Sequence, residues 1–129
     1  MGSDKDKRKK AVKFTDLEAW QYGHALAVDI YKVTKNWPKD EQYGLISQIR
    51  RAAVSVTSNL AEGFSRSTKS DKKHFYVMAH GSLTELQNQL LLSKDIGYLD
   101  NASLQKLAGK TVVVHKLITG LIKSLEVSK

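Results

Sequence analysis

The sequence contains no cysteine and only one proline, Pro38, among its 129 residues. Without cysteine there can be no disulfide and no thiolate metal site, and nothing indicates an oxidising compartment. No uninterrupted apolar run approaches the roughly 20 residues that a transmembrane helix needs. The basic N-terminus is not followed by the apolar segment that a secretory signal contains. We therefore expect a cytoplasmic protein with no membrane partner.

Motifs that carry enzyme chemistry are also missing. The sequence has no P-loop, no Gly-x-Gly-x-x-Gly and no nucleophile elbow. Neither Glu62 nor Glu85 has a histidine three residues later, as the Glu-x-x-His pairs of di-metal bundles require. The four histidines are dispersed, and no two of them stand four residues apart as in a helical zinc motif. We predict a protein that is not an enzyme, with no cofactor, no metal site and no catalytic residue.

Positive charge is abundant but unevenly distributed. The formal net charge is +8, from 21 lysines and arginines against 13 acidic residues. Residues 1–13 hold six basic and two acidic side chains, which is half of the excess. We predict a disordered basic tail over 1–13 and one helical domain over 14–127. The tail residues predicted to contact phosphates are Lys7, Arg8, Lys9 and Lys10. A solubilising tail, in part an expression remnant, is the equally weighted alternative.

Four segments show the three-to-four-residue apolar spacing of amphipathic helices. We expect them over about residues 15–36, 40–64, 70–97 and 101–125. The first opens on Thr15-Asp16-Leu17-Glu18, a capping-box pattern, and Gly97 is well placed to end the third. Segments of about 30–40 Å joined by short connections favour antiparallel neighbours. The predicted fold is therefore an all-α, antiparallel up-down-up-down four-helix bundle.

The same spacing predicts which face of each helix is buried. In the first segment this face comprises Leu17, Trp20, Ala27, Val28 and Tyr31. In the second it comprises Leu45, Ile49, Ala52, Val56 and Leu60. In the third it comprises Phe75, Ala79, Leu83, Leu86 and Leu90. In the fourth it comprises Leu104, Leu107, Val114, Ile118, Leu121 and Leu125.

A row of polar residues runs beside the apolar stripe of the second segment. It consists of Gln48, Arg51, Ser55, Asn59 and Glu62. At about 100° per residue these positions fall within roughly 80° of arc. Most of them carry neutral hydrogen-bonding groups, which suit a buried or half-buried network. A smaller group of the same kind on the third segment consists of Gly81, Ser82 and Glu85.

Two interpretations of this polar row remain open. In the structural one, it lies at a seam between helices or subunits, with Arg51 paired to a carboxylate such as Glu62 or Glu85. In the functional one, it lines a groove for a ligand or a nucleic acid. We favour the structural interpretation. Gly81 costs about 1 kcal/mol inside a helix, and a close helix contact would compensate for that cost.

The break between the second and third segments is basic. It holds Arg66, Lys69, Lys72 and Lys73 with a single acid, Asp71. With the tail and with Arg50, which we expect to face solvent, these residues offer a phosphate-contacting surface. Aromatic side chains do not interleave with them, so base stacking is not indicated. A solvated loop is the competing interpretation, and the sequence alone favours it. Any binding would be electrostatic and salt-sensitive.

Three stretches carry a resemblance to a known family. They are FTDLEAWQ over 14–21, QIRRAAVS over 48–55 followed by NLAEG over 59–63, and GSLTEL over 81–86 with Leu90. In order and spacing they resemble the four-helix-bundle proteins encoded in intervening sequences of bacterial 23S ribosomal RNA genes. The family motif maps here onto Gln48, Arg51, Ser55, Asn59, Glu62, Gly63, Ser82 and Glu85. It supplies no catalytic residue.

The resemblance, which covers about residues 14–125, implies a ring-shaped homopentamer. It also implies kinship with the accessory variability proteins of diversity-generating retroelements, which bind nucleic acid and a reverse transcriptase through a basic surface. From it we expect a non-catalytic oligomer that binds RNA or DNA electrostatically. The alternative is a structural or protein-interaction scaffold whose polar row builds the oligomer and which has no nucleic-acid role.

Overall fold

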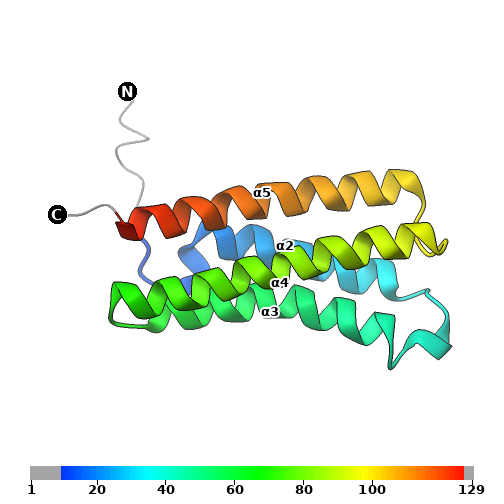
Figure 1. The fold of residues 1–129 in the computed structure, drawn as a ribbon, viewed down its shortest axis with the longest axis horizontal. Helices are drawn as coiled ribbons and strands as arrows, with labels where there is room; N and C mark the ends of the chain where they lie inside the picture. The colour runs from blue at the N-terminus through cyan, green and yellow to red at the C-terminus, as the bar shows by residue number, and fades with distance from the viewer. Residues whose placement is uncertain (1–9, 127–129) are drawn as a thin grey trace.

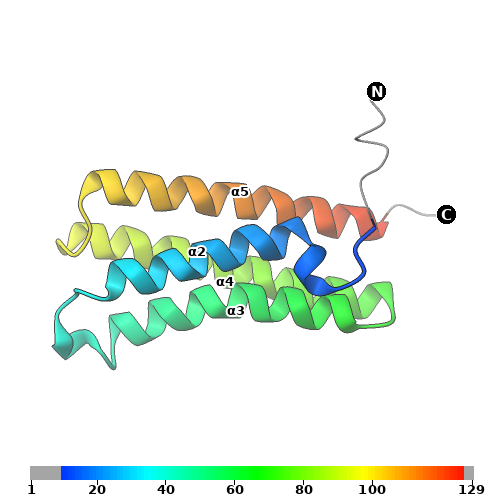
Figure 2. The same ribbon diagram turned by 180° about the vertical axis from the view of Figure 1, so that it is seen from behind.

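The computed structural model describes residues 10–126, which fold into four α-helices and two short 3₁₀ turns. The helices are α2 (Glu18–Thr34), α3 (Leu45–Ser65), α4 (Lys69–Asp95) and α5 (Asn101–Glu126), and the turns are η1 (Phe14–Asp16) and η2 (Lys39–Glu41). Each helix packs antiparallel to the next, and α5 returns to contact α2 (Figures 1 and 2). The prediction of an all-α, up-down-up-down four-helix bundle is confirmed.

The turn between α4 and α5 follows the sequence-based prediction. Gly97 has a φ of +91°, a left-handed conformation that glycine adopts without steric cost. The amide of Tyr98 donates to the carbonyl of Ser93 at 2.8 Å, and that of Gly97 donates to Lys94 at 3.0 Å. This pair of bonds is the Schellman motif that ends many helices. Asp100 then caps α5, because its Oδ1 accepts from the amide of Ser103 at 2.7 Å.

The starts of the first two helices differ from the predictions. Thr15 and Glu18 form no capping box; Leu17 occupies the cap position of α2, with no side-chain cap bond. The Asp16 carboxylate instead accepts from the amides of Val12 and Lys13 at 2.9 and 3.1 Å, which stabilises η1 ahead of α2. Similarly, α3 begins at Leu45, not near residue 40, because the backbone of Gly44 is not helical.

The predicted buried faces of the last three helices are largely confirmed. Every member of the predicted α3 stripe is buried, and so are four of five on α4, with Phe75 half-buried. On α5, Leu104, Leu107, Val114 and Ile118 are buried, whereas Leu121 and Leu125 are partly so. These residues line the axis of the bundle, where each helix meets two neighbours.

The buried face of α2 differs from the prediction. Val28 and Tyr31 are 39% and 45% exposed, and the buried face comprises Ala19, Gly23, Leu26, Ala27, Ile30 and Thr34. Small residues on this face bring α2 close to α3: a β-carbon on Gly23 would lie 3.2 Å from Cγ2 of Thr57. The hydroxyl of buried Thr34 is satisfied by the carbonyl of Ile30 at 2.8 Å.

The two ends of the described chain meet at one end of the bundle, beside the connection between α3 and α4 (Figure 1). At the opposite end lie the C-terminus of α2, the turn η2 and the start of α5. Within residues 10–126, no helix has both the length and the apolar character needed to cross a bilayer.

Candidate nucleic-acid interface

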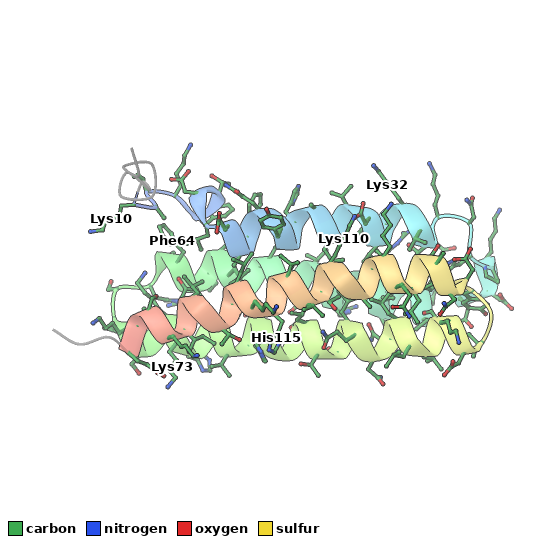
Figure 3. All side chains as sticks on the ribbon, turned by 90° about the horizontal axis from the view of Figure 1, so that it is seen from above. Lys10, Lys32, Phe64, Lys73, Lys110 and His115 are labelled. Carbon is green, nitrogen blue, oxygen red and sulfur yellow. The ribbon has the colours of Figure 1, made fainter. Side chains whose placement is uncertain are left out.

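The predicted phosphate-contacting residues lie on two separate parts of the bundle. Lys10 and Lys73 lie toward one end of the bundle, as does Phe64 near the C-terminus of α3 (Figure 3). Arg50 stands sixteen residues before Arg66, so it lies about 24 Å away along α3. Residues 1–9 of the predicted tail, which include Lys7, Arg8 and Lys9, are outside the residues that the structure describes. The predicted residues that the structure describes therefore do not form one continuous surface.

The basic end of the bundle comprises Lys10, Arg66, Lys69, Lys72 and Lys73. Arg66 Nη2 lies 2.5 Å from Glu62 Oε2, and its guanidinium lies 4.7 Å from the centre of the Phe75 ring. Lys73 Nζ lies 3.3 Å from Glu126 Oε2. Carboxylates therefore offset two of the cations at the basic end.

The remaining lysines of the basic end differ in their contacts. Lys72 Nζ donates to the carbonyl of Phe64 at 2.7 Å and lies 5.2 Å from the centre of that ring. This contact links the start of α4 to the end of α3. The side chain of Lys69 makes no hydrogen bond or ion pair with residues 10–126 and is exposed. Most of the cations in this break thus stabilise local structure as well as presenting charge.

A second basic surface, which the sequence reasoning missed, surrounds the C-terminal half of α2. This α2 surface comprises Lys32, Lys35, Arg50, Lys106 and Lys110, with Asp29 as the carboxylate among them. Lys32 and Lys110 lie on facing helices toward the end opposite Lys10 and Lys73 (Figure 3). The sequence signal was weak because Lys32 and Lys35 are more than 70 residues away from Lys106 and Lys110. Only the packing of α2 against both α3 and α5 brings the five cations together.

An open groove of about 770 Å³ lies between α2 and α3 on one side of this surface. Its lining comprises His24, Ala27, Val28, Tyr31, Lys32, Lys35, Arg50, Val54 and Thr57. We expected Arg50 to face solvent, but its side chain is half-buried here. Its Nε donates to Thr34 Oγ1 at 2.8 Å, and its guanidinium lies 4.5 Å from the centre of the Tyr31 ring.

A smaller groove of about 260 Å³ lies on the other side of α2, against α5. It is lined by Asp29, Lys32, Val33, Ser103, Lys106, Leu107 and Lys110. Lys110 and Asp29 form an ion pair across the two helices. This pair holds one cation close to a carboxylate, whereas Lys32 and Lys106 have no ion pair within residues 10–126. The α2 surface therefore keeps an excess of positive charge after this internal pairing.

The polar row of α3 is a helix–helix network at its centre only. Ser55 Oγ lies 2.8 Å from Ser82 Oγ on α4, and Asn59 Nδ2 donates to Ser55 Oγ at 3.1 Å. The side chains of Gln48 and Arg51 are exposed and have no hydrogen bond or ion pair within residues 10–126. The predicted pairing of Arg51 with a carboxylate is therefore absent from the described chain.

The two carboxylates suggested as partners of Arg51 have other contacts. Glu62 pairs with Arg66 one turn later in the same helix, where the spacing brings the side chains together. Glu85 Oε2 accepts from Gln89 Nε2 at 3.4 Å. Gly81, for which we expected a close helix contact, has nothing within 4 Å of a β-carbon built on it. That expectation is wrong within the chain, because Gly81 faces outward.

Two histidines meet across α4 and α5, although the sequence placed them 35 residues apart. The ring centres of His80 and His115 are 4.3 Å apart. Burial and the neighbouring His115 lower the pKa of His80 below its ordinary value. No third histidine or carboxylate completes a metal-ligating group among the described residues. The pair is therefore a pH-sensitive contact, away from the α2 surface.

Comparisons with known proteins place the chain in context. The model of the 23S rRNA-intervening sequence protein family matches residues 15–120. A crystal structure from Bacteroides thetaiotaomicron, described as a protein of unknown function from the S23 ribosomal protein family, superposes with a TM-score of 0.76. The two chains are 19% identical over 81% of this chain and 95% of the other, which shows a shared fold. No curated protein matches the chain.

Proposed function

Since the chain belongs to the 23S rRNA-intervening sequence protein family, we propose that it is a non-catalytic bundle that binds RNA or DNA through the α2 surface. One observation carries the proposal: five cations line the two grooves along α2, with one carboxylate among them. Such a concentration of one charge attracts a polyanion and releases its counterions. The basic end supplies additional phosphate contacts, chiefly through exposed Lys69.

The geometry of the α2 surface supports a polyanion with regularly spaced charges. Lys32 on α2 and Lys35 at the C-cap of that helix are three residues apart, and Lys106 and Lys110 are one turn apart on α5. Because α2 and α5 pack side by side, the lysines form two neighbouring rows and not a single point of charge. Separate rows favour a linear phosphate backbone over a single small anion.

Assembly belongs to the same proposal. A homopentamer would repeat the α2 surface five times, and kinship with retroelement accessory proteins would make a reverse transcriptase a further partner. Both ideas follow from the family resemblance described above. Sedimentation of the purified chain measures the first, and co-purification with a reverse transcriptase encoded beside the gene measures the second.

The test of nucleic-acid binding is a salt series with RNA and DNA oligonucleotides. Changing Lys32, Lys35 and Lys106 to alanine removes three cations that have no ion pair within residues 10–126. We expect the variant to bind more weakly and the magnitude of the slope of log K against log salt to fall by about 2–3, because each of the three phosphate contacts contributes roughly 0.7–0.9. No binding at low salt by the unmodified chain would contradict the proposal.

A matched control separates local charge from net charge. Changing Lys94, Lys116 and Lys123 to alanine removes the same charge from α4 and α5 outside both grooves. We expect this control to retain most of the affinity. An equal loss in both triple variants would show that binding follows net charge alone and would overturn the assignment to the α2 surface.

The scaffold function remains a second candidate because of two outward residues on α3. The side chains of Gln48 and Arg51 have no partner within residues 10–126, although the centre of the same row is bonded across α3 and α4. Partners on another subunit would satisfy both side chains. If they build the oligomer, Arg51→Ala dissociates it in a sedimentation experiment, and an unchanged oligomer rejects this role for the row.

A further inference from the structure

The α2–α3 groove has more apolar surface than phosphate contacts require. Ala27, Val28 and Val54 form part of its lining, and Val28 and Val54 are 39% and 40% exposed. Tyr31 adds an aromatic ring that is 45% exposed. Lys32, Lys35 and Arg50 stand around these groups in the same groove. Apolar, aromatic and cationic groups therefore share one site that is open to solvent.

Arg50 and Tyr31 form a fixed pair within the groove. The Arg50 guanidinium lies 4.5 Å from the ring centre, and its Nε is held by Thr34 Oγ1 at 2.8 Å. Its Nη2 also donates to the carbonyl of Tyr31 at 3.4 Å. A guanidinium has five N–H donors, so three remain for a ligand. The pair offers flat surfaces beside free donors, and little side-chain ordering is needed when a ligand binds.

These groups match the chemistry of a nucleotide in a single strand. An unstacked base presents a flat, largely apolar face, which aromatic rings and arginine planes bind. Its phosphates are joined to the base through the sugar, and Lys32 and Lys35 in the lining of the groove would bind them. Bases in a duplex are stacked on one another, so their faces cannot enter the groove. The aromatic ring that the sequence does not interleave with the basic residues is thus supplied by Tyr31, which packing places among the cations.

We propose that the α2–α3 groove binds unstacked bases, so that this protein prefers single-stranded nucleic acid to duplex. The inference rests on the proposed nucleic-acid function and specifies its substrate class. An acidic amphipathic peptide would also meet apolar and cationic groups. The fixed Arg50–Tyr31 pair favours a base, because planar stacking is the interaction that such a pair provides.

The decisive comparison changes the ligand and leaves the protein intact. Fluorescence anisotropy measures binding of a labelled single-stranded oligonucleotide and of an abasic strand with the same number of phosphates. A duplex of equal length is the third probe. We expect the abasic strand and the duplex to bind at least about 5-fold more weakly than the single strand, the lower limit for one base on an aromatic ring. Equal affinity for all three probes overturns the inference.

Variants of the protein test whether the preference for bases arises in the α2–α3 groove. Tyr31→Ala should bring affinity for the single strand down to that for the abasic strand, with the salt dependence unchanged because no cation is removed. Tyr22→Ala is the matched control, since Tyr22 is 52% exposed on the same helix and lies outside the groove. Equal effects of the two substitutions would overturn the assignment to the groove. The oligonucleotide comparison retains its meaning even if Tyr31→Ala fails to fold.

The outcomes separate the two proposals. Salt-sensitive binding without preference for bases leaves the proposed function standing and rejects the groove as a base site. Absence of binding to every nucleic acid at low salt rejects both. Competition by an acidic amphipathic peptide, together with indifference to bases, would assign the groove to a protein partner instead.

Discussion

The hydroxyl oxygens of Ser55 on α3 and Ser82 on α4 lie 2.8 Å apart, which makes them hydrogen-bonded partners across two helices. Asn59 extends this network, because its side-chain amide donates to Ser55 Oγ at 3.1 Å and to the Ser55 carbonyl at 2.9 Å. The centre of the polar row therefore stabilises the α3–α4 contact and is not available to line a binding groove.

We expect Ser55→Ala and Ser82→Ala each to lower the free energy of unfolding by about 1 kcal/mol, because each leaves a half-buried partner without its bond. The double variant should lose less than the sum of the single variants, since both remove the same bond. Urea unfolding measures these values. Ser58→Ala, at an exposed position on α3, is the control and should have little effect. Strict additivity would contradict a direct Ser55–Ser82 interaction.

Gly63 permits close packing of Tyr76 at the end of α3. A β-carbon there would lie 2.7 Å from Tyr76 Cε1 and 3.0 Å from the β-carbon of Phe75. Tyr76 is 2% exposed, so its ring has little room to move. We expect Gly63→Ala to destabilise the chain by about 1–3 kcal/mol, the usual cost of overpacking. Thermal and urea unfolding measure the change.

Gly81→Ala is the matched control for Gly63, since both glycines lie inside helices. Nothing lies within 4 Å of a β-carbon at Gly81, so the substitution should stabilise the isolated chain by about 0.5–1 kcal/mol through helix propensity. Loss of stability at both positions would show that backbone conformation, and not contact with Tyr76, explains the effect at Gly63.

The His80–His115 contact should make stability depend on pH. The pKa of His80 is lowered in the folded chain, so the unfolded chain binds the proton at a higher pH. The contribution of neutral His80 to the free energy of unfolding is therefore fully present above the ordinary histidine pKa of about 6.5. It is lost as the pH falls through that value toward the lowered pKa of the folded chain. His80→Gln should lose less stability between pH 7.5 and 5.5, measured by urea unfolding at each pH. A drop as large as in the unmodified chain would contradict the explanation, and His74→Gln is the control.

Asp29 should oppose nucleic-acid binding at the α2 surface. It is the carboxylate among five cations and forms an ion pair with Lys110. Asp29→Asn should therefore tighten binding severalfold at low salt, while losing at most about 1 kcal/mol of stability, because the pair is partly exposed. Binding titrations at two salt concentrations measure the gain. Asp95→Asn, at an exposed position on α4, changes net charge equally and should have a smaller effect.

Local sequence signals determined the helices and several of their ends. Apolar spacing identified four helices and the buried face of α3, because a helix repeats its environment every three to four residues. Gly97 could be predicted because its left-handed backbone is a local requirement. The start of α2 could not be predicted, because the Asp16 carboxylate accepts from the amides of Val12 and Lys13 and takes no part in a cap of α2. The local sequence signals for these two arrangements are similar.

Tertiary structure alone decided which charged and polar groups meet. The sequence grouped Arg50 with Arg66 as basic residues, but helical rise separates them, and packing places Arg50 on Tyr31 beside Lys32. His80 and His115 likewise became neighbours only through the pairing of α4 with α5. Periodicity fixes the direction of a side chain relative to its own helix. The neighbouring helix, its register and its distance determine what that side chain touches, and these depend on the packing of the whole bundle.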